Sequence, residues 1–199
     1  PAGILAQASG GLAFDMFRID QAGTTSLSSH SEVTPSVDLE LRMPLVRAGT
    51  NGTDVIEPIV QVAGVGGSNA FIPNDENTRI EFDEGNLFST SRFVAPDRRE
   101  RGLMASYGIN WTRFMNSGWQ SALAVGQLIR DEDQLEFNGN DSFSSASGLN
   151  SEISDLLVAG QLKSNDGLVL TARSLFNGVA EATKAEARAR WNNDTTALA

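Results

Sequence analysis

Hydrophobic and polar residues alternate along several long stretches of the chain. Between positions 103 and 112 the odd positions are apolar or aromatic and the even ones are mostly small or polar. A repeat of two residues is the period of a β-strand, not of a helix. Similar runs occur at 10–19, 37–45, 55–62, 119–130, 156–163, 168–177 and 186–191. The pattern predicts an all-β protein with roughly eight antiparallel strands.

The connections between these runs differ in length. Tight turns are predicted at 48–53, 116–118 and 164–167, where Asn, Asp, Ser and Gly cluster. Long polar loops are predicted at about 20–32, 66–98 and 131–151, so that short and long connections alternate. Outer-membrane barrels have short periplasmic turns and long outer loops. We therefore expect a segment of an up-and-down transmembrane β-barrel, present as an open sheet or partial barrel.

The two faces of the predicted strands suggest different surroundings. Six polar residues oppose apolar neighbours and are expected to face the lumen of the barrel: Glu40, Arg42, Glu57, Gln61, Arg173 and Arg188. Three tryptophans fall on outward positions toward the predicted tight turns, as an interfacial aromatic belt would require: Trp111, Trp119 and Trp191. A soluble β-sandwich would also turn charged residues toward water, so the charges alone do not decide between the two folds.

Composition excludes several classes of function. The chain carries 25 Asp and Glu against 15 Lys and Arg, a net charge of −10, which argues against a nucleic-acid partner. There is no Cys and one His, so a thiolate or two-histidine metal site is excluded. No recognisable nucleophile motif accompanies His30. We expect neither an enzyme nor a bound cofactor or metal.

A distinctive run of motifs lies within the longest predicted loop. It comprises Ile72-Pro73-Asn74-Asp75-Glu76-Asn77, then Glu81-Phe82-Asp83-Glu84-Gly85-Asn86-Leu87-Phe88-Ser89, then Arg92-Phe93 and Asp97-Arg98-Arg99-Glu100. This run resembles the central barrel region of the LptD (OstA/Imp) family, the lipopolysaccharide-assembly proteins of Gram-negative outer membranes, and looks most like the alphaproteobacterial branch. The likeness extends in colinear order over about 36–178.

The resemblance implies a function and partners. Family members are barrels of about 26 strands. They pass lipopolysaccharide through a lateral seam into the outer leaflet, and an LptE-like lipoprotein plugs their lumen. A preceding jellyroll domain meets the periplasmic Lpt bridge, and we expect that domain and the seam to lie outside this sequence. The family motif residues would either pack the loop over the barrel mouth or face lipopolysaccharide: Asn74, Asp75, Asp83, Asn86, Leu87, Phe88, Arg92, Phe93, Asp97 and Arg98.

Two other interpretations remain open at this stage. A small complete eight-stranded barrel, serving as an anchor or adhesin, would have a similar strand pattern. A soluble β-sandwich binding module is the third. We expect the chain to be a wall segment in contact with outer-membrane lipid, because no signal peptide is recognisable at its start and the last predicted strand is weak.

Overall fold

The computed structural model describes residues 3–18, 29–67, 80–94, 98–131, 143–144, 146–192 and 197–198. In these residues ten strands form a single sheet, and no helix is present. Accordingly, the described part of the chain contains no helix that could cross a membrane. The strands are β1 (Leu5–Arg18), β2 (Ser29–Arg42), β3 (Leu45–Gly49), β4 (Gly52–Val65), β5 (Gly102–Met115), β6 (Gln120–Arg130), β7 (Leu156–Lys163), β8 (Leu168–Phe176), β9 (Ala182–Asn192) and β10 (Ala197–Leu198).

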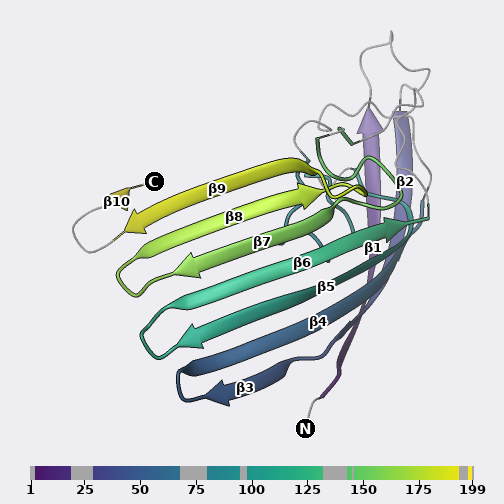
Figure 1. Ribbon diagram of the computed structural model, residues 1–199. Coiled ribbons are helices and arrows are strands. Elements are labelled where there is room, and N and C mark those ends of the chain that lie inside the picture. Colours follow the sequence, from purple (N-terminus) through teal and green to yellow (C-terminus); the bar gives the residue numbers. More distant parts are fainter. Residues whose placement is uncertain are drawn as a thin grey trace.

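The strands follow one another across the sheet in chain order. The order is β1-β2-β4-β5-β6-β7-β8-β9-β10, β3 pairs with β4, and every pairing is antiparallel (Figure 1). β1 and β10 lie at opposite edges, so the sheet does not close on itself. This open up-and-down sheet confirms the predicted partial barrel. It contradicts a closed eight-stranded barrel, and the described residues form no second sheet of the kind a sandwich requires.

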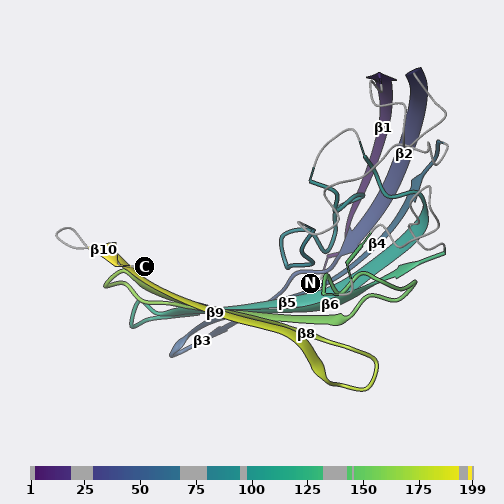
Figure 2. The same ribbon diagram turned by 90° about the horizontal axis from the view of Figure 1, so that it is seen from above.

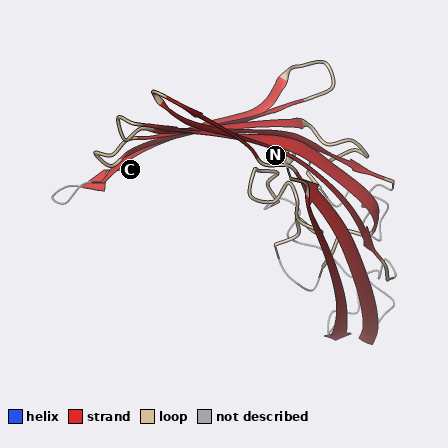
Figure 3. Ribbon diagram, turned by 90° about the horizontal axis from the view of Figure 1, so that it is seen from below, coloured by secondary structure: helices blue, strands red, loops and turns tan. Residues whose placement is uncertain are grey.

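The sheet is strongly curved. β1 and β2 bend away from the plane of β5 to β9, as a segment of barrel wall would (Figure 2). Figure 3 shows loop segments lying on the concave side of the sheet. We call this side the inner face and the convex side the outer face. The hydrophobic core therefore lies between the inner face and these loops.

β2 and β3 behave as one strand with a break in its middle. Arg42 pairs with Ile59 and Leu45 with Ile56, so the register is the same on both sides of the break. Pro58 carries no N–H, and across the break one backbone bond remains, in which the Met43 N–H donates to the Pro58 carbonyl over 3.0 Å. Pro44, between β2 and β3, and Pro58 on β4 thus weaken the pairing locally without adding a bulge residue.

Two connections differ from expectation. β2 already begins at Ser29, so His30 lies in a strand opposite Phe17 and not in a loop. β8 and β9 are joined by a short connection at the end of the sheet where the other connections are long. There the Asn177 side-chain oxygen accepts the N–H of Glu181 over 2.9 Å, and Ala180 adopts a φ of 62°. The predicted strict alternation of short turns and long loops is therefore wrong at this point.

Candidate functional site

The outer face is free of charge over a broad band. On β4 and β5 this band begins beyond Asp54 and Arg113, whose side chains lie 3.7 Å apart on the outer face near the tight turns. Beyond them the outer positions of the two strands carry no charged residue: Ile56, Pro58, Val60, Val62, Gly64, Leu103, Ala105, Tyr107, Ile109 and Trp111. Many of these side chains are exposed, Ile109 by 52% and Leu103 by 60%. An apolar face of this length fits contact with lipid.

This band crosses the strands obliquely. It covers Leu103–Trp111 on β5 and Leu168–Phe176 on β8. When the pairing is followed from β5 through β6 and β7, Trp111 lies level with Ala172 on β8. The band on β8 continues to Leu168, so it extends four residues closer to the tight turns there than on β5. Four residues span about 13 Å and three strand spacings about 14 Å, which gives a strand tilt of about 40°. Membrane barrels have tilts in this range.

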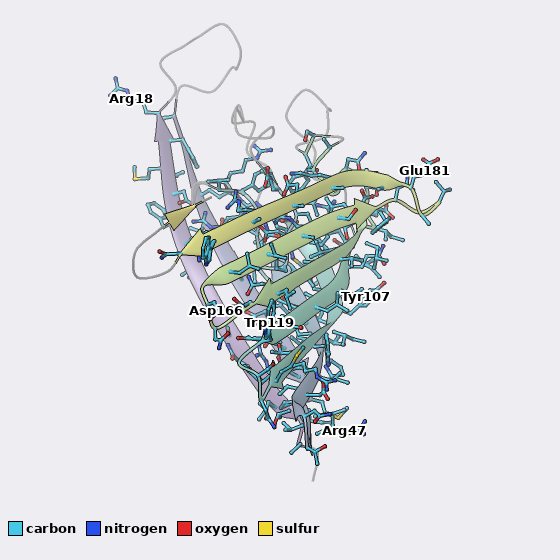
Figure 4. The ribbon with its side chains drawn as sticks, turned by 60° about the vertical axis from the view of Figure 1, so that its left-hand side comes forward. Arg18, Arg47, Tyr107, Trp119, Asp166 and Glu181 are labelled. Atoms are coloured by element: carbon cyan, nitrogen blue, oxygen red, sulfur yellow. The ribbon has the colours of Figure 1, made fainter. Side chains whose placement is uncertain are left out.

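The three tryptophans lie toward the end of the strands that has tight turns. The edge of the band nearest the tight turns is marked by Trp111 on β5. On β9 it is marked by Trp191, which pairs with Leu168. Their indole N–H groups donate to Asp54 (3.3 Å) and to the Asp166 carbonyl (2.9 Å). Trp119 lies beyond this edge, beside its turn; in Figure 4 it lies with Asp166, away from Arg18 at the opposite end. The aromatic belt stays a prediction, with Trp119 nearer the rim than the other two.

The register places all six residues expected in the lumen on the inner face. Glu40 pairs with Gln61, Arg42 lies two residues further along β2, and Glu57 follows the same period on β4. Arg173 pairs with Glu186, and Arg188 comes two residues later on β9. Whether this face borders a water-filled lumen is a proposal that we develop below.

Two long connections fold back onto the inner face and form what we call the loop block, residues 80–94, 98–101, 143–144 and 146–155. Its apolar side chains cover the part of β4 to β8 that lies away from the tight turns. Loop and strand residues share one buried cluster, made of Ile80, Phe82, Leu87, Phe93, Phe143 and Leu149 from the loops and Ala63, Val65, Met104, Leu128, Leu157 and Leu175 from the strands. The only large hydrophobic core in the described residues therefore lies between two loops and the inner face of the sheet.

A pair of glycines makes room for this loop. Gly108 and Gly126 lie opposite each other on β5 and β6. A Cβ atom on Gly126 would come within 2.3 Å of Leu87 Cδ2, and one on Gly108 within 3.2 Å. The missing side chains thus create a socket that Leu87 fills, with the leucine 2% exposed. Close approach of a side chain to the strand backbone is a use to which glycine is suited.

Motif residues also shape the turn that leads into this socket. The Asp83 carboxylate accepts the N–H groups of Gly85 (2.9 Å) and Asn86 (3.0 Å). The Asn86 side chain accepts the Asp83 N–H over 3.0 Å and donates to the Glu81 carbonyl over 2.6 Å. These reciprocal bonds fix a compact turn of the kind that Asp and Asn favour. Phe88 follows Leu87 and packs, partly buried, against the apolar cluster.

Arg92 belongs to a buried ion triad that joins the two connections. Glu100 lies between Arg92 (3.1 Å) and Arg130 (3.4 Å), and all three side chains are at most 1% exposed. Arg92 also donates to the Leu87 carbonyl over 3.0 Å, and Arg130 donates to the carbonyls of Leu149 and Ser151. One carboxylate therefore holds two guanidinium groups, each of which ties down a different loop.

Aromatic contacts cover the same region. The rings of Phe93 and Phe143 stack with centroids 5.0 Å apart, joining the two connections a second time. The guanidinium of Arg98 lies 5.0 Å from the Phe93 ring, and that of Arg130 lies 5.0 Å from the Phe143 ring. Such cation–π contacts are strongest where water is excluded.

Partly exposed charge pairs also join the loop block to β8 and β9. Arg173 on β8 lies 3.1 Å from Asp83 and 2.8 Å from Glu186, and Lys184 on β9 lies 3.1 Å from Glu81. These groups are partly exposed, so each pair contributes little stability by itself. Their role is to set the position of the turn over β8 and β9.

On the opposite side, the segment before β5 holds the β1–β2 hairpin. Arg101 lies 2.8 Å from Glu32 and donates to the Thr34 hydroxyl over 2.8 Å, while Arg99 pairs with Asp15. Burial lowers the pKa of Arg101, and the Glu32 carboxylate opposes that shift. Arginine remains protonated at neutral pH all the same, so the pair persists.

The predicted motif residues thus fall into two groups. Those in the loop block, Asp83 to Phe93 with Arg98, are brought together, while Asn74, Asp75 and Asp97 lie outside the described residues. Sequence reasoning did not select Glu100, Arg130 or Phe143 as site residues. Glu100 is the last residue of the quoted motif run, whereas nothing local marked Arg130, which ends a strand on its inner face.

One comparison identifies the family to which this arrangement belongs. The family model of LptD, described as LPS transport system D, matches residues 4–199. The chain belongs to the LptD family. Its role accordingly lies in lipopolysaccharide transport and assembly, in a family of outer-membrane proteins that work with the Lpt system. A search of curated proteins found no match.

Proposed function

We propose that this LptD-family chain forms part of the barrel wall of the outer-membrane translocon that inserts lipopolysaccharide into the outer leaflet. Its outer face meets lipid, and its inner face borders the polar path taken by the sugar. The family membership supports the transport role, and the tilted, charge-free outer band supports the placement in the wall. That band is the observation on which the proposal rests.

The inner face provides for two kinds of partner. Toward the tight turns, next to Glu84 of the loop block, it carries small and polar side chains that line a hollow of about 330 Å³, including Asn110, Thr112, Ala122, Ala124 and Gln161. A hollowed polar surface of this kind suits an LptE-like lipoprotein that plugs the lumen from the periplasm. Delivery of lipopolysaccharide would come from the periplasmic Lpt bridge through a domain of the protein outside this chain.

The loop block defines the outer end of this path. Its side chains bond chiefly to one another, so we assign the described motif residues Asp83, Asn86, Leu87, Phe88, Arg92, Phe93 and Arg98 to packing rather than to lipopolysaccharide binding. In this assignment the loop block narrows the barrel mouth.

Depletion of the full-length protein tests the proposal. Cells carrying a conditional copy are pulse-labelled, and newly made lipopolysaccharide is quantified at the surface and in the inner membrane. We expect it to accumulate in the inner membrane on depletion and to return to the surface on complementation. Unchanged surface lipopolysaccharide after complete depletion would refute the proposed function.

A further inference from the structure

Three charged side chains form a row on the outer face of the sheet. Among the described residues of β3 to β9, the outward positions that carry charge are Arg47, Asp54 and Arg113. Arg47 pairs with Asp54, and Asp54 pairs with Arg113, so the three residues lie side by side across β3, β4 and β5. We call them the charged row. It directly follows the charge-free band on the side of the tight turns.

The charged row lies at the depth where lipid headgroups are expected. Leu45 on β3 and Trp111 on β5 belong to the last apolar row of the band, one outward position before the charges. In Figure 4, Arg47 lies at the same edge of the sheet as Trp119 and Asp166. A cation on the lipid face is costly at the bilayer midplane but not at the interface, and tryptophan prefers the interface. Tight turns face the periplasm in membrane barrels, and the periplasmic leaflet consists of phospholipid.

The contacts within the charged row leave one positive charge uncompensated. Arg113 lies 3.7 Å from the Asp54 carboxylate, and the Trp111 indole N–H donates to the same carboxylate oxygen over 3.3 Å. Arg47 lies on a strand whose five residues are all exposed, and within the described part of the chain its guanidinium has no ion-pair partner. Two guanidinium groups and one carboxylate carry a net charge of +1. The outer face of β3 to β9 is therefore cationic here, although the whole chain has a net charge of −10.

This set of groups matches the headgroup of an anionic phospholipid. A guanidinium binds a phosphate group through parallel N–H donors. Arg47 and Arg113 lie two strand spacings apart, about 10 Å, so their long side chains can approach one headgroup from two sides. The Asp54 carboxylate between them can accept a hydrogen bond from a headgroup hydroxyl. The net positive charge favours a lipid with net negative charge over a zwitterionic one.

We propose that the charged row and Trp111 bind the headgroup of one anionic glycerophospholipid of the periplasmic leaflet. The inference rests on the proposed function, because it requires the outer face to meet lipid. Arg47 binds the phosphate, Arg113 supports it while Asp54 holds its guanidinium, and the Trp111 ring packs against the glycerol backbone. The bound lipid fixes the depth of the β3–β5 corner in the membrane.

Quenching by brominated lipids measures this preference locally. The full-length protein, with a fluorescent amino acid at outward position 45 or 170, is reconstituted into phosphatidylcholine vesicles. The vesicles contain a minor fraction of dibrominated phosphatidylglycerol or dibrominated phosphatidylethanolamine. Leu45 and Leu170 are both 38% exposed, and Leu170 has no outward charge beside it. One basic residue near the surface strengthens the association of an anionic lipid about fivefold, so we expect a fivefold preference for phosphatidylglycerol at 45 and none at 170.

Substitutions in the charged row separate charge from shape. Arg47→Gln removes the uncompensated charge and should abolish the preference at position 45, whereas Arg47→Lys keeps the charge and should retain most of it. Arg113→Gln leaves Asp54 to compensate Arg47 and should reduce the preference as much as Arg47→Gln does. Arg190→Gln, on the inner face of β9, is the matched control and should have no effect.

The outcomes distinguish this site from the proposed function. Equal quenching by the two brominated lipids at 45, an equal preference at 45 and 170, or a preference that survives Arg47→Gln would each overturn the site and leave the wall intact. Displacement of brominated phosphatidylglycerol by an equal amount of lipopolysaccharide would also overturn it, since the phosphate would then come from the transported lipid. Absence of quenching by either lipid at both positions would overturn the contact of the outer face with lipid, and with it the proposed function.

Discussion

The loop block depends on the charge of Glu100. Replacing this residue by Gln keeps the size of the side chain and removes its negative charge. Arg92 and Arg130 would then remain as two guanidinium groups, buried to within 1% of their surface, with no counter-charge in the triad. The wall strands β7 to β9 do not contribute to the triad, so the perturbation is confined to the loops and to the upper ends of β5 and β6.

The expected magnitude follows from the burial of the three groups. Breaking a buried pair by removing one partner costs about 3–5 kcal/mol, because an uncompensated charge stays in a poorly solvated place. Here one substitution leaves two such charges at 3.1 and 3.4 Å from the altered group. Local opening of the loop block should therefore become more frequent by about 10² to 5 × 10³-fold.

Hydrogen–deuterium exchange of the full-length protein in detergent micelles measures this opening. Peptides within 80–94 and 146–155 should exchange faster by that factor in Glu100→Gln, and peptides of β8 and β9 should be unchanged. Glu181→Gln, in an exposed turn, is the control. Replacing the whole triad by apolar residues (Arg92→Met, Glu100→Leu, Arg130→Met) should restore most of the protection.

Two results would refute this reasoning. A change of less than tenfold in Glu100→Gln would show that the triad contributes little to loop stability. A triple variant that exchanges as fast as the single one would show that lost packing, and not unpaired charge, opens the loops.

Two further substitutions probe other parts of the account. Gly126→Ala places a Cβ where Leu87 lies and should destabilise the loop block by about 1–3 kcal/mol, measured by the same exchange experiment; Gly160→Ala, with no atom closer than 3.8 Å, should be neutral, and equal effects would contradict the socket. Ile109→Arg on the outer face should cost about 2–4 kcal/mol at the bilayer midplane and reduce assembly into the outer membrane. Asn110→Arg on the inner face should still insert into the outer membrane, whatever its effect on the proposed plug, and the reverse order of the two variants in membrane insertion would contradict the assignment of faces.

The strands and their faces could be predicted because the alternation is a local property. Each side chain from Leu103 to Trp111 reports its own side of the sheet, and the register confirmed those sides without exception. The family motif was equally visible, since its residues are consecutive. Its resemblance to the LptD family was confirmed by the family match over 4–199.

The loop block could not be predicted in the same way because it depends on contacts between distant segments. Arg130 lies 30 residues from Glu100 in sequence, and the socket for Leu87 requires glycines from two different strands. The short connection after β8 was missed although Asn177-Gly178 is a dipeptide that favours turns.

The central claim is that one face of this sheet meets lipid and the other meets water. Because the chain contains no native Cys, spin labels can be attached at single cysteines placed in turn at positions 103–112 of the full-length protein, in a background without other cysteines. We expect labels at odd positions to be relaxed by membrane-dissolved oxygen and labels at even positions 110 and 112, which lie between the loop block and the tight turns, to be reached by a water-soluble nickel complex. Equal access of the nickel complex to both sets of positions would contradict the account.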